Sequence, residues 1–406
     1  MTGILEGIKV LGMGHVVAIP AAGAMLADWG AEVIKVEPLS GEMYRGLRKI
    51  LGVDKVIKFD TGEVDWAIQL LNRNQKSLAV DLRKEAGRDI LYRLVQRSDV
   101  FMSNYRVSSL TGLKLDYATL SRLNLGLVYA VLTGYGLVGP DKDERGYDYS
   151  AAWARSGIQY SMGEPESPPP PQRPGMMDRV AAAHVVASIL AALLYREKTG
   201  IGQELELSLY HVGVWTLSQD IQGALMGLPL PKDERTKAPN PLWNTYRTRD
   251  GRWFQLVMLR SDIHWPNFCR AIERPELEND SRFNTMETRA QHCEELIRIL
   301  EEVLASKNME DWERRFRQHN CTYGRVQTPV ETISDPQAVA NDFFAEIQHP
   351  VAGEMKLVTT PTKFHENPAS IRTPAPEVGQ HTEEILLELG NSWDDIARLK
   401  EQGVIL

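Results

Sequence analysis

The sequence is poor in the residues that usually hold structural metals or disulfide bonds. Its 406 residues include three cysteines, Cys269, Cys293 and Cys321, which are odd in number and widely spaced. This pattern predicts neither a disulfide framework nor a CxxC zinc site. The nine histidines show no HxxxH or HExxH spacing, so the metalloprotease pattern is missing as well. We therefore expect a protein that binds no metal.

A basic segment, a leader and a membrane-length apolar run are also missing. The net charge is −8 and no long basic run offsets it, which disfavours a nucleic-acid partner. The opening residues, MTGILEGIKVLGMG, lack the basic region and cleavage site of a signal peptide. The most apolar stretch, residues 180–195, is too short to cross a bilayer. We expect a cytoplasmic protein without a membrane partner.

What the sequence does contain, from residue 5 to about 210, is alternating strand-like and helix-like segments. An apolar run at 8–13 is followed by a helical stretch at 20–29 and a second strand at 32–36. Such a βαβ start implies a parallel sheet covered by helices. Later segments continue the alternation: strands at 77–82, 99–103 and 127–133, and helices at 84–96 and 117–123. The predicted fold class is α/β with a Rossmann-like parallel sheet.

The composition changes after about residue 228, where LPKDERTKAPNP is polar and contains proline. Such a stretch predicts a domain boundary. Beyond it, two short strands around Asp250-Gly251 and three helices (262–272, 289–305, 309–318) indicate a smaller α+β unit. Helices at 335–344 and 382–401 with a strand at 354–359 follow. The predicted division is a large domain over 1–225, a small domain over 226–330, and a C-terminal segment over 331–406.

A glycine pair after the first strand invites a dinucleotide-binding interpretation. Gly12 and Gly14 fit the start of a GxGxxG fingerprint, and Glu37 ends the second strand where a ribose-binding acid would lie. The third glycine is replaced by Val17, and Pro20 falls where the phosphate-binding helix should already have begun. These departures disfavour a nicotinamide cofactor.

The segment 174–209 contains one aspartate before a long apolar helix. Asp178 precedes an Ala-, Val-, Ile- and Leu-rich run, and Gly200 ends the helix before a strand at 204–209. Asp178 could be an ordinary N-cap, because Asp is favoured there. The less common alternative is an ionised carboxylate placed to act as a nucleophile or base. The local sequence leaves both interpretations open.

Three longer stretches carry a family resemblance. LEGIKVLGMGHVVAIPAAGAMLADWGAEVIKVEP, NRNQKSLAVDLRKEAGRDILYRLVQRSDVFMSNYR and LDYATLSRLNLGLVYAVLTGYGLVGP resemble the class III (family III) coenzyme A transferases. The segment around Asp178, ending in TGIGQ, resembles that family's catalytic segment. PDKDERGYDYSAAWARSG and PNPLWNTY look most like the transferases that exchange CoA among 2-hydroxyacyl and 2-enoyl acids, including aryl-substituted ones.

The resemblance implies a reaction and an assembly. CoA would move from an acyl-CoA thioester to a free carboxylic acid, with Asp178 forming a mixed anhydride and then an aspartyl-CoA thioester. CoA and acyl-CoA would be substrates, and no cofactor would be bound permanently. The C-terminal segment would return to the large domain, and two chains would form an interlocked homodimer.

The resemblance also implies which residues bind CoA. Its phosphates call for guanidinium and amide donors. The alternative for the basic residues of this set is a solvated surface charge. The implied CoA-binding residues are His15, Val17, Ala18, Asn72, Arg73, Asn74, Gln75, Lys76, Asn104, Tyr105, Arg106, Thr133, Gly134, Tyr135 and Gly136.

Three positions depart from the family's basic residues: Pro38, Gln75 and Gly112. Because these positions grip CoA in some members, binding of the adenine end is expected to rely on other residues, with Arg45 or Arg48 as candidates.

Two alternatives to the transferase stay in view. A 2-methylacyl-CoA racemase of the same family needs a second acid/base opposite the aspartate, and a His in a Gly-His-Asp motif supplies it. This chain has Gly146-Tyr147-Asp148, and tyrosine is too weak an acid to replace histidine easily. A non-catalytic CoA-binding protein is disfavoured by the intact Asp178.

The acyl pocket is predicted only in outline. Val17 replaces a glutamine of the oxalate-using members, so an oxalate substrate is disfavoured. Tyr147, Tyr149, Trp153 and the region of Trp243 offer aromatic walls, although core roles are equally compatible with each. They favour an arylacyl or branched acyl group.

Overall fold

The computed structural model describes residues 3–406, which form two compact units. The larger unit contains residues up to 159 together with 171–228 and 337–406, and the smaller unit contains 160–170 and 229–336. The C-terminal segment thus belongs to the larger unit. Compared with the division expected from the sequence, the smaller unit ends six residues later and also takes in the proline-rich stretch before residue 171.

The larger unit is built on a six-stranded parallel sheet, as the alternating pattern predicted. Its order is β10-β9-β8-β1-β2-β7. The chain adds β2 and β7 on one side of β1 and then returns to the other side for β8, β9 and β10. This is the doubly wound order, in which ligands bind beyond the carboxyl ends of the strands at the point of reversal. The strands are β1 (Lys9–Met13), β2 (Glu32–Glu37), β7 (Lys76–Ala79), β8 (Val100–Ser103), β9 (Val128–Thr133) and β10 (Glu204–Ser208).

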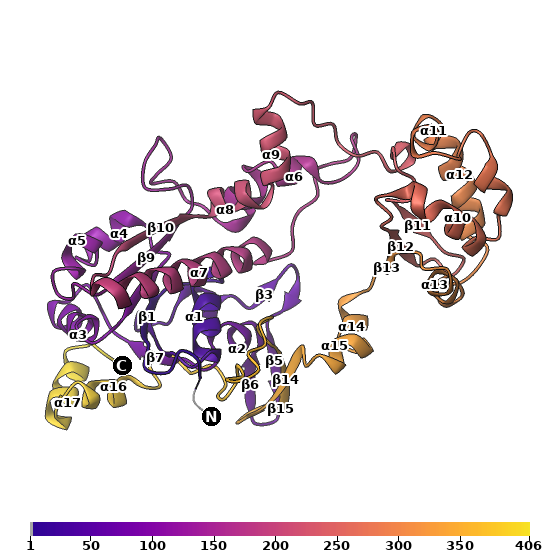
Figure 1. Ribbon diagram of the computed structural model, residues 1–406. Coiled ribbons are helices and arrows are strands. Elements are labelled where there is room, and N and C mark those ends of the chain that lie inside the picture. Colours follow the sequence, from indigo (N-terminus) through magenta and orange to yellow (C-terminus); the bar gives the residue numbers. More distant parts are fainter. Residues whose placement is uncertain (1–2) are drawn as a thin grey trace. The chain divides into compact units, whose positions relative to one another are not determined.

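Helices cover both faces of this sheet (Figure 1). On one face, α1 (Ala18–Asp28) and α7 (Met176–Thr199) pack on Val10 and the strand residues aligned with it. On the other, α3 (Glu85–Val95), α16 (Thr382–Glu388) and α17 (Trp393–Glu401) pack on Leu11 and its neighbours. Adjacent strand residues point to opposite faces, so both must be apolar, and the strands read as continuous hydrophobic runs.

Helix α7 is longer than its apolar run suggested. It extends over 24 residues, from a first turn that contains Asp178 to a left-handed Gly200, and its length and mean hydropathy would suffice to cross a bilayer. Half of its most apolar window is buried inside the larger unit. The expectation of too short a helix was therefore wrong, but the burial explains the composition, because a core helix is apolar for the same reason.

The remaining elements of the larger unit are short. Two hairpins between β2 and α2 and one near the C-terminus complete its strands. These elements are β3 (Lys49–Ile50), β4 (Val53–Asp54), β5 (Val56–Phe59), β6 (Gly62–Asp65), β14 (Phe344–His349), β15 (Gly353–Val358), η1 (Met43–Gly46), α2 (Trp66–Asn72), α4 (Val107–Gly112), α5 (Tyr117–Leu120), η2 (Asp148–Ala154, a π-helix), α6 (Ile158–Ser161), α8 (Leu209–Thr216), α9 (Ser218–Leu225) and α15 (Pro336–Ala340).

The smaller unit has its own aromatic core around Trp265, Trp312 and Phe316. The helix expected over 289–305 is split at His292. An antiparallel sheet and short helices make up the unit: β11 (Thr245–Arg247), β12 (Trp253–Leu256), β13 (Tyr323–Arg325), η3 (Arg235–Lys237), α10 (Ser261–Ala271), η4 (Pro275–Asn279), α11 (Met286–Gln291), α12 (Cys293–Leu304), α13 (Met309–Gln318) and α14 (Pro329–Thr332).

The C-terminal segment is attached to the β7 edge of the large sheet. The His381 N–H donates to the Ser77 carbonyl at 3.0 Å. Val80 forms an antiparallel bridge with Ile405, and the Asp81 N–H donates to Val404 at 2.8 Å. The last residues of the chain therefore complete an edge that the first eighty residues leave open.

Candidate active site

A pocket of about 600 Å³ opens at the carboxyl ends of β1, β2, β8 and β9. It lies where the strand order reverses, between β1 and β8, which is the expected ligand position in a doubly wound sheet. Its volume falls in the range of small-molecule sites. Its walls are the loop after β1 (residues 15–18), the loop after β2 (38–43), the loop after β8 (104–109), the end of β9 (132–134), residues 142–147, Asp178 and Leu209.

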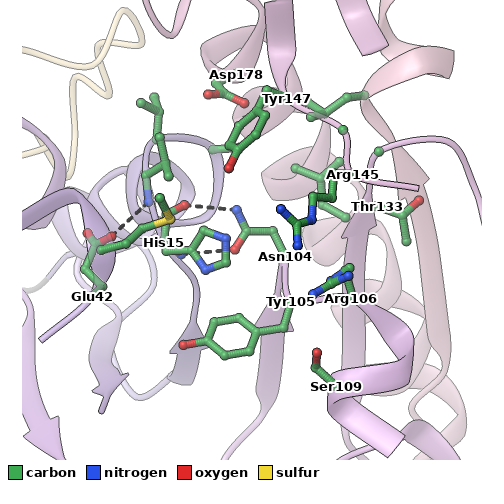
Figure 2. A pocket seen from close by; sticks show the side chains of 18 of the residues that line it. His15, Glu42, Asn104, Tyr105, Arg106, Ser109, Thr133, Arg145, Tyr147 and Asp178 are labelled. Carbon is green, nitrogen blue, oxygen red and sulfur yellow. Dashed lines mark hydrogen bonds between the residues drawn. The ribbon is translucent and has the colours of Figure 1, made fainter. Parts of the chain in front are cut away.

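Asp178 lies at one end of this pocket, next to Tyr147 (Figure 2). It is the third residue of α7, and the N-cap is Gly175, with φ 69°. The cap interpretation of Asp178 is therefore wrong. Asp148 lies near the start of the helix, where the backbone N–H groups of Asp178 and Gly175 lower its pKa. The Asp178 carboxylate is left free to face the pocket.

The electrostatics of this pair favour a proton near neutral pH. The pKa of Asp178 is raised to about 7, because burial and, next, the negative charge of Asp148 raise it by more than Arg179 lowers it. Burial also raises the pKa of Asp148, against the Gln172 amide and the backbone donors that lower it. Two buried carboxyl groups close together do not ionise independently. The charge of Asp178 therefore changes in the pH range where enzymes work.

The loop after β1 is held in a strained shape. Asn104 clamps the backbone of His15, because its Oδ1 accepts the His15 N–H and its Nδ2 donates to the His15 carbonyl, both at 3.0 Å. Val16 has φ 67°, an outlier for a β-branched residue. Its N–H donates to Glu42 at 2.9 Å, and buried Lys35 holds Glu42 at 3.1 Å. These bonds compensate the strain and fix Val17 in the pocket wall.

Gly14 has a packing role at the end of β1. A Cβ on Gly14 would lie 2.3 Å from the Ile19 side chain, so this glycine permits close packing of α1 on β1. The backbone of the next residue, His15, is held beside the pocket by its two hydrogen bonds to Asn104 and not by a further glycine.

The structure gathers many of the residues that the resemblance implied. Nine of them line the one pocket: His15, Val17, Ala18, Asn104, Tyr105, Arg106, Thr133, Gly134 and Asp178. Tyr135 and Gly136 lie just beyond its wall. There the Tyr135 ring contacts the Arg155 guanidinium, and the Gly136 N–H donates to Thr133.

The run Asn72, Arg73, Asn74, Gln75 and Lys76 is not part of this lining. Arg73 is buried and forms an ion pair with Asp28 at 2.8 Å. Asn72 accepts from Lys35 and donates to the Ile68 carbonyl, and Asn74 donates to Asp28 and to the Ser370 carbonyl. Gln75 donates to the Pro20 and Leu71 carbonyls, and Lys76 forms an ion pair with Glu384. Their donors thus have partners within the chain.

The two alternatives for binding the adenine end are paired as well. Arg45 donates to Glu37 at 2.8 Å from a half-buried position. Arg48 forms an exposed pair with Glu63 at 2.9 Å. Neither lines the pocket.

Two basic pocket residues were missed from the sequence. Lys142 and Arg145 line the pocket, and Figure 2 shows Arg145 and Arg106 directed toward the same space. Within residues 3–406, no ion pair engages Arg106, Lys142 or Arg145. Acidic residues flank Lys142 and Arg145 in PDKDERGY, and no local pattern marks either residue as a ligand contact.

The aromatic residues expected to wall the acyl pocket are scattered. Tyr147 lines the pocket, whereas the Tyr149 hydroxyl donates to the Gln172 carbonyl at 3.3 Å. Trp153 is buried in the core under α7, and Trp243 belongs to the smaller unit. Across the part of the chain that the structure describes, no group of three His, Cys, Asp or Glu residues is placed to hold a metal ion.

Comparisons with known proteins identify the class to which this fold and pocket belong. The chain matches CoA-transferase family III over residues 5–382 and belongs to that family; it is a CoA-transferase. It is 33% identical to (R)-2-hydroxy-4-methylpentanoate CoA-transferase of Clostridioides difficile, with 99% of each chain covered. It is 32% identical to cinnamoyl-CoA:phenyllactate CoA-transferase of Clostridium sporogenes, covering 100% of this chain and 98% of the other.

Solved structures agree with this assignment. A CAIB/BAIF family protein from Brucella suis superimposes with a TM-score of 0.83 at 27% identity, over 96% of this chain and 100% of the other.

Proposed function

We propose that the protein moves CoA from an acyl-CoA thioester to a free carboxylic acid through covalent intermediates on Asp178. The observation that carries the proposal is the Asp178 carboxylate itself. It is buried, it is not the N-cap of α7, and it lines the pocket at the switch point of the sheet. A carboxylate becomes an effective nucleophile when it is desolvated and still able to ionise. Its pKa of about 7 fits that requirement.

The reaction proceeds in balanced steps. The ionised Asp178 attacks the thioester carbonyl and expels CoA thiolate, which leaves a mixed anhydride. The thiolate then attacks the aspartyl carbonyl, releases the first acid and forms an aspartyl-CoA thioester. The acceptor carboxylate attacks this thioester, expels CoA thiolate again and re-forms an anhydride. The thiolate finally attacks the acceptor's acyl carbonyl and releases the Asp178 carboxylate. Each step passes a charge between nucleophile and leaving group, so no proton is consumed.

The phosphates of CoA are assigned to the unpaired cations of the pocket. Arg106, Lys142 and Arg145 line it and have no acidic partner among the described residues. Phosphate–guanidinium bonds are strong and directional. The Asn104 clamp holds the loop after β1, along which the pantetheine arm would run toward Asp178.

The substrate class follows from the relatives and from the pocket. The names of two relatives specify 2-hydroxy-4-methylpentanoate and phenyllactate. We assign to this chain the same kind of acceptor or donor acid, a 2-hydroxy or 2-enoyl acid with a branched or aryl side chain. Tyr147 supports transfer over racemisation, because it stands where a racemase needs a stronger acid/base.

An interlocked homodimer in the cytoplasm is part of the proposal. Large apolar side chains are exposed on α7, α8 and α9 and just beyond them, among them Leu194, Trp215, Leu225 and Met226. Exposed apolar surface of this kind marks interaction sites, and a second copy of the chain is the partner that we assign to it.

The test is intact-protein mass spectrometry after mixing the protein with a panel of acyl-CoA thioesters. We expect a CoA-sized adduct that hydroxylamine removes and that Asp178→Ala does not form. The matched control is Asp116→Ala, because Asp116 caps α5 outside the pocket lining; this variant should still form the adduct. No adduct with any thioester, together with exchange of the α-proton in deuterated water, would instead establish the racemase.

A further inference from the structure

A second, smaller cavity lies on the other side of Val17 from the main pocket. Its volume is about 260 Å³, and Val17 lines both spaces. Most of the other walls are apolar and come from η1, the β3–β4 hairpin and α2. They are Tyr44, Ile50, Val53, Trp66, Ala67, Leu70 and Leu71. Neither the transfer mechanism nor the CoA assignment uses this cavity.

The cavity is adjacent to the reacting carboxylate. Arg179, the residue after Asp178 in α7, contributes to its wall. The Tyr44 ring lies close enough to Asp178 and Arg179 for both charges to act on its pKa, which burial, the largest cause, raises to about 12. An acid whose head group lies at Asp178 therefore has an apolar space next to it.

The polar part of the wall is cationic. Arg173 and Arg179 are its charged residues, and no acidic side chain within residues 3–406 forms an ion pair with either. The Arg179 Nη1 donates to the Gly175 carbonyl at 3.0 Å, which fixes the guanidinium near the start of α7. An apolar chamber with two unpaired guanidinium groups complements a carboxylate that carries an apolar tail.

From this arrangement we infer that the cavity behind Val17 is the subsite for the side chain of the exchanged carboxylic acid. The inference rests on the function proposed above. The tail occupies the space between Tyr44, Trp66 and Leu70, and the carboxylate points toward Arg179 and Asp178. An apolar cavity of roughly 150 Å³ accommodates benzene, so the space suits one benzyl or isobutyl group.

The test compares two acceptor acids that share a head group, lactate and phenyllactate, with one acyl-CoA donor. Val53→Trp fills the cavity from the hairpin, where Val53 is 58% exposed and therefore replaceable without disturbing a core. We expect kcat/KM for phenyllactate to fall at least 10-fold and that for lactate to change less than about 3-fold. The matched control is Leu125→Trp, which adds the same indole at an exposed site outside both cavities and should change neither value.

A second variant, which should enlarge the cavity instead of filling it, keeps the subsite testable if Val53→Trp misfolds. Leu70→Ala enlarges the cavity and should raise the preference for 2-hydroxy-4-phenylbutanoate over phenyllactate by about 10-fold. If Val53→Trp lowers kcat/KM by the same factor for both acids, or changes neither value, the subsite is overturned. The CoA adduct on Asp178 distinguishes failure of the subsite from failure of the proposed function. If the wild type forms the adduct but Val53→Trp leaves the ratio of kcat/KM for the two acids unchanged, only the subsite is overturned. If the wild type forms no adduct, the proposed transfer itself is overturned.

Discussion

Two sets of basic residues in the larger unit have opposite surroundings. Arg73, just after α2, and Lys76, the first residue of β7, lie within ion-pair distance of acidic side chains. Arg106 and Arg145, beyond the ends of β8 and β9, line a pocket without such a partner among the described residues. The family resemblance implied a CoA-binding role for Arg73, Lys76 and Arg106 alike, and Arg145 was missed. Whether a basic residue is available to a ligand therefore depends on whether an acidic side chain already pairs with it, and not on its residue type.

The Arg73–Asp28 pair illustrates the first case. Both side chains are buried, and burial, the largest cause, still raises the pKa of Asp28 despite the Arg73 guanidinium. Such a pair adds little net stability, yet breaking it leaves a charge buried alone. Its place in the structure is therefore to join α1 to the segment before β7.

Arg73→Ala should produce the largest change in stability, because Asp28 would remain buried without a partner. We expect the free energy of unfolding to fall by about 3–5 kcal/mol and the KM for acyl-CoA to stay unchanged. Urea denaturation and steady-state kinetics measure the two quantities. The matched control is Arg314→Ala, which removes an exposed pair with Asp311 and should change stability little. A raised KM in Arg73→Ala with unchanged stability would reverse the comparison.

Asp178→Asn should stabilise the protein in a pH-dependent way. The folded pKa of about 7 lies above the ordinary 3.8, so the native state holds the proton more tightly than the unfolded state does. The wild type therefore loses stability as the pH rises from about 4 to 7. The asparagine variant escapes this loss and should be more stable above pH 7 by up to about 4 kcal/mol, with no advantage near pH 4. Denaturation at pH 4 and pH 8 tests it, and an equal gain at both contradicts it.

Arg145→Gln should weaken substrate binding without affecting stability. One charge-assisted bond to phosphate corresponds to about a 10- to 100-fold rise in the KM for acyl-CoA. Dephospho-CoA thioesters would show whether the 3′-phosphate is the group bound, since the variant should then lose little more with them. Arg122→Gln, an exposed arginine outside the pocket lining, serves as the control and should leave the KM unchanged.

Lys76→Gln should have the smallest effect. The lysine is about one-quarter exposed and has three half-exposed glutamate neighbours, Glu32, Glu384 and Glu388. Its loss should change the free energy of unfolding by less than about 1 kcal/mol and leave the KM for acyl-CoA unaffected. A 10-fold rise in that KM would return Lys76 to the CoA site implied by the family resemblance.

The sequence was most informative where burial is complete. The strand expected at 127–133 is β9 (Val128–Thr133), and the helix expected at 309–318 is α13 (Met309–Gln318). Buried parallel strands and strongly amphipathic helices leave an unbroken apolar pattern. The hairpins at 49–65 were missed because their strands are short and largely exposed, so no periodicity marks them.

The site was only partly predictable for a different reason. Asp178 was singled out because it precedes a recognisable helix, whereas the loops after β1 and β8 were assigned to CoA from the family resemblance. The sequence could not show whether Arg73 or Arg145 is available to CoA, since the acidic partner that neutralises Arg73 lies 45 residues away in the sequence. A local pattern carries no information about that distance.

The late completion of the β7 edge has a consequence for synthesis. Residues 404 and 405 pair with residues 80 and 81. During synthesis on a ribosome, the β7 edge of the sheet therefore stays incomplete until residues 404 and 405 have emerged. The smaller unit is complete by residue 336 and has a core of its own, which allows it to fold while the larger unit is still open. Because contacts across such separations form slowly, the interrupted larger unit is the part of the nascent chain that most needs protection from aggregation.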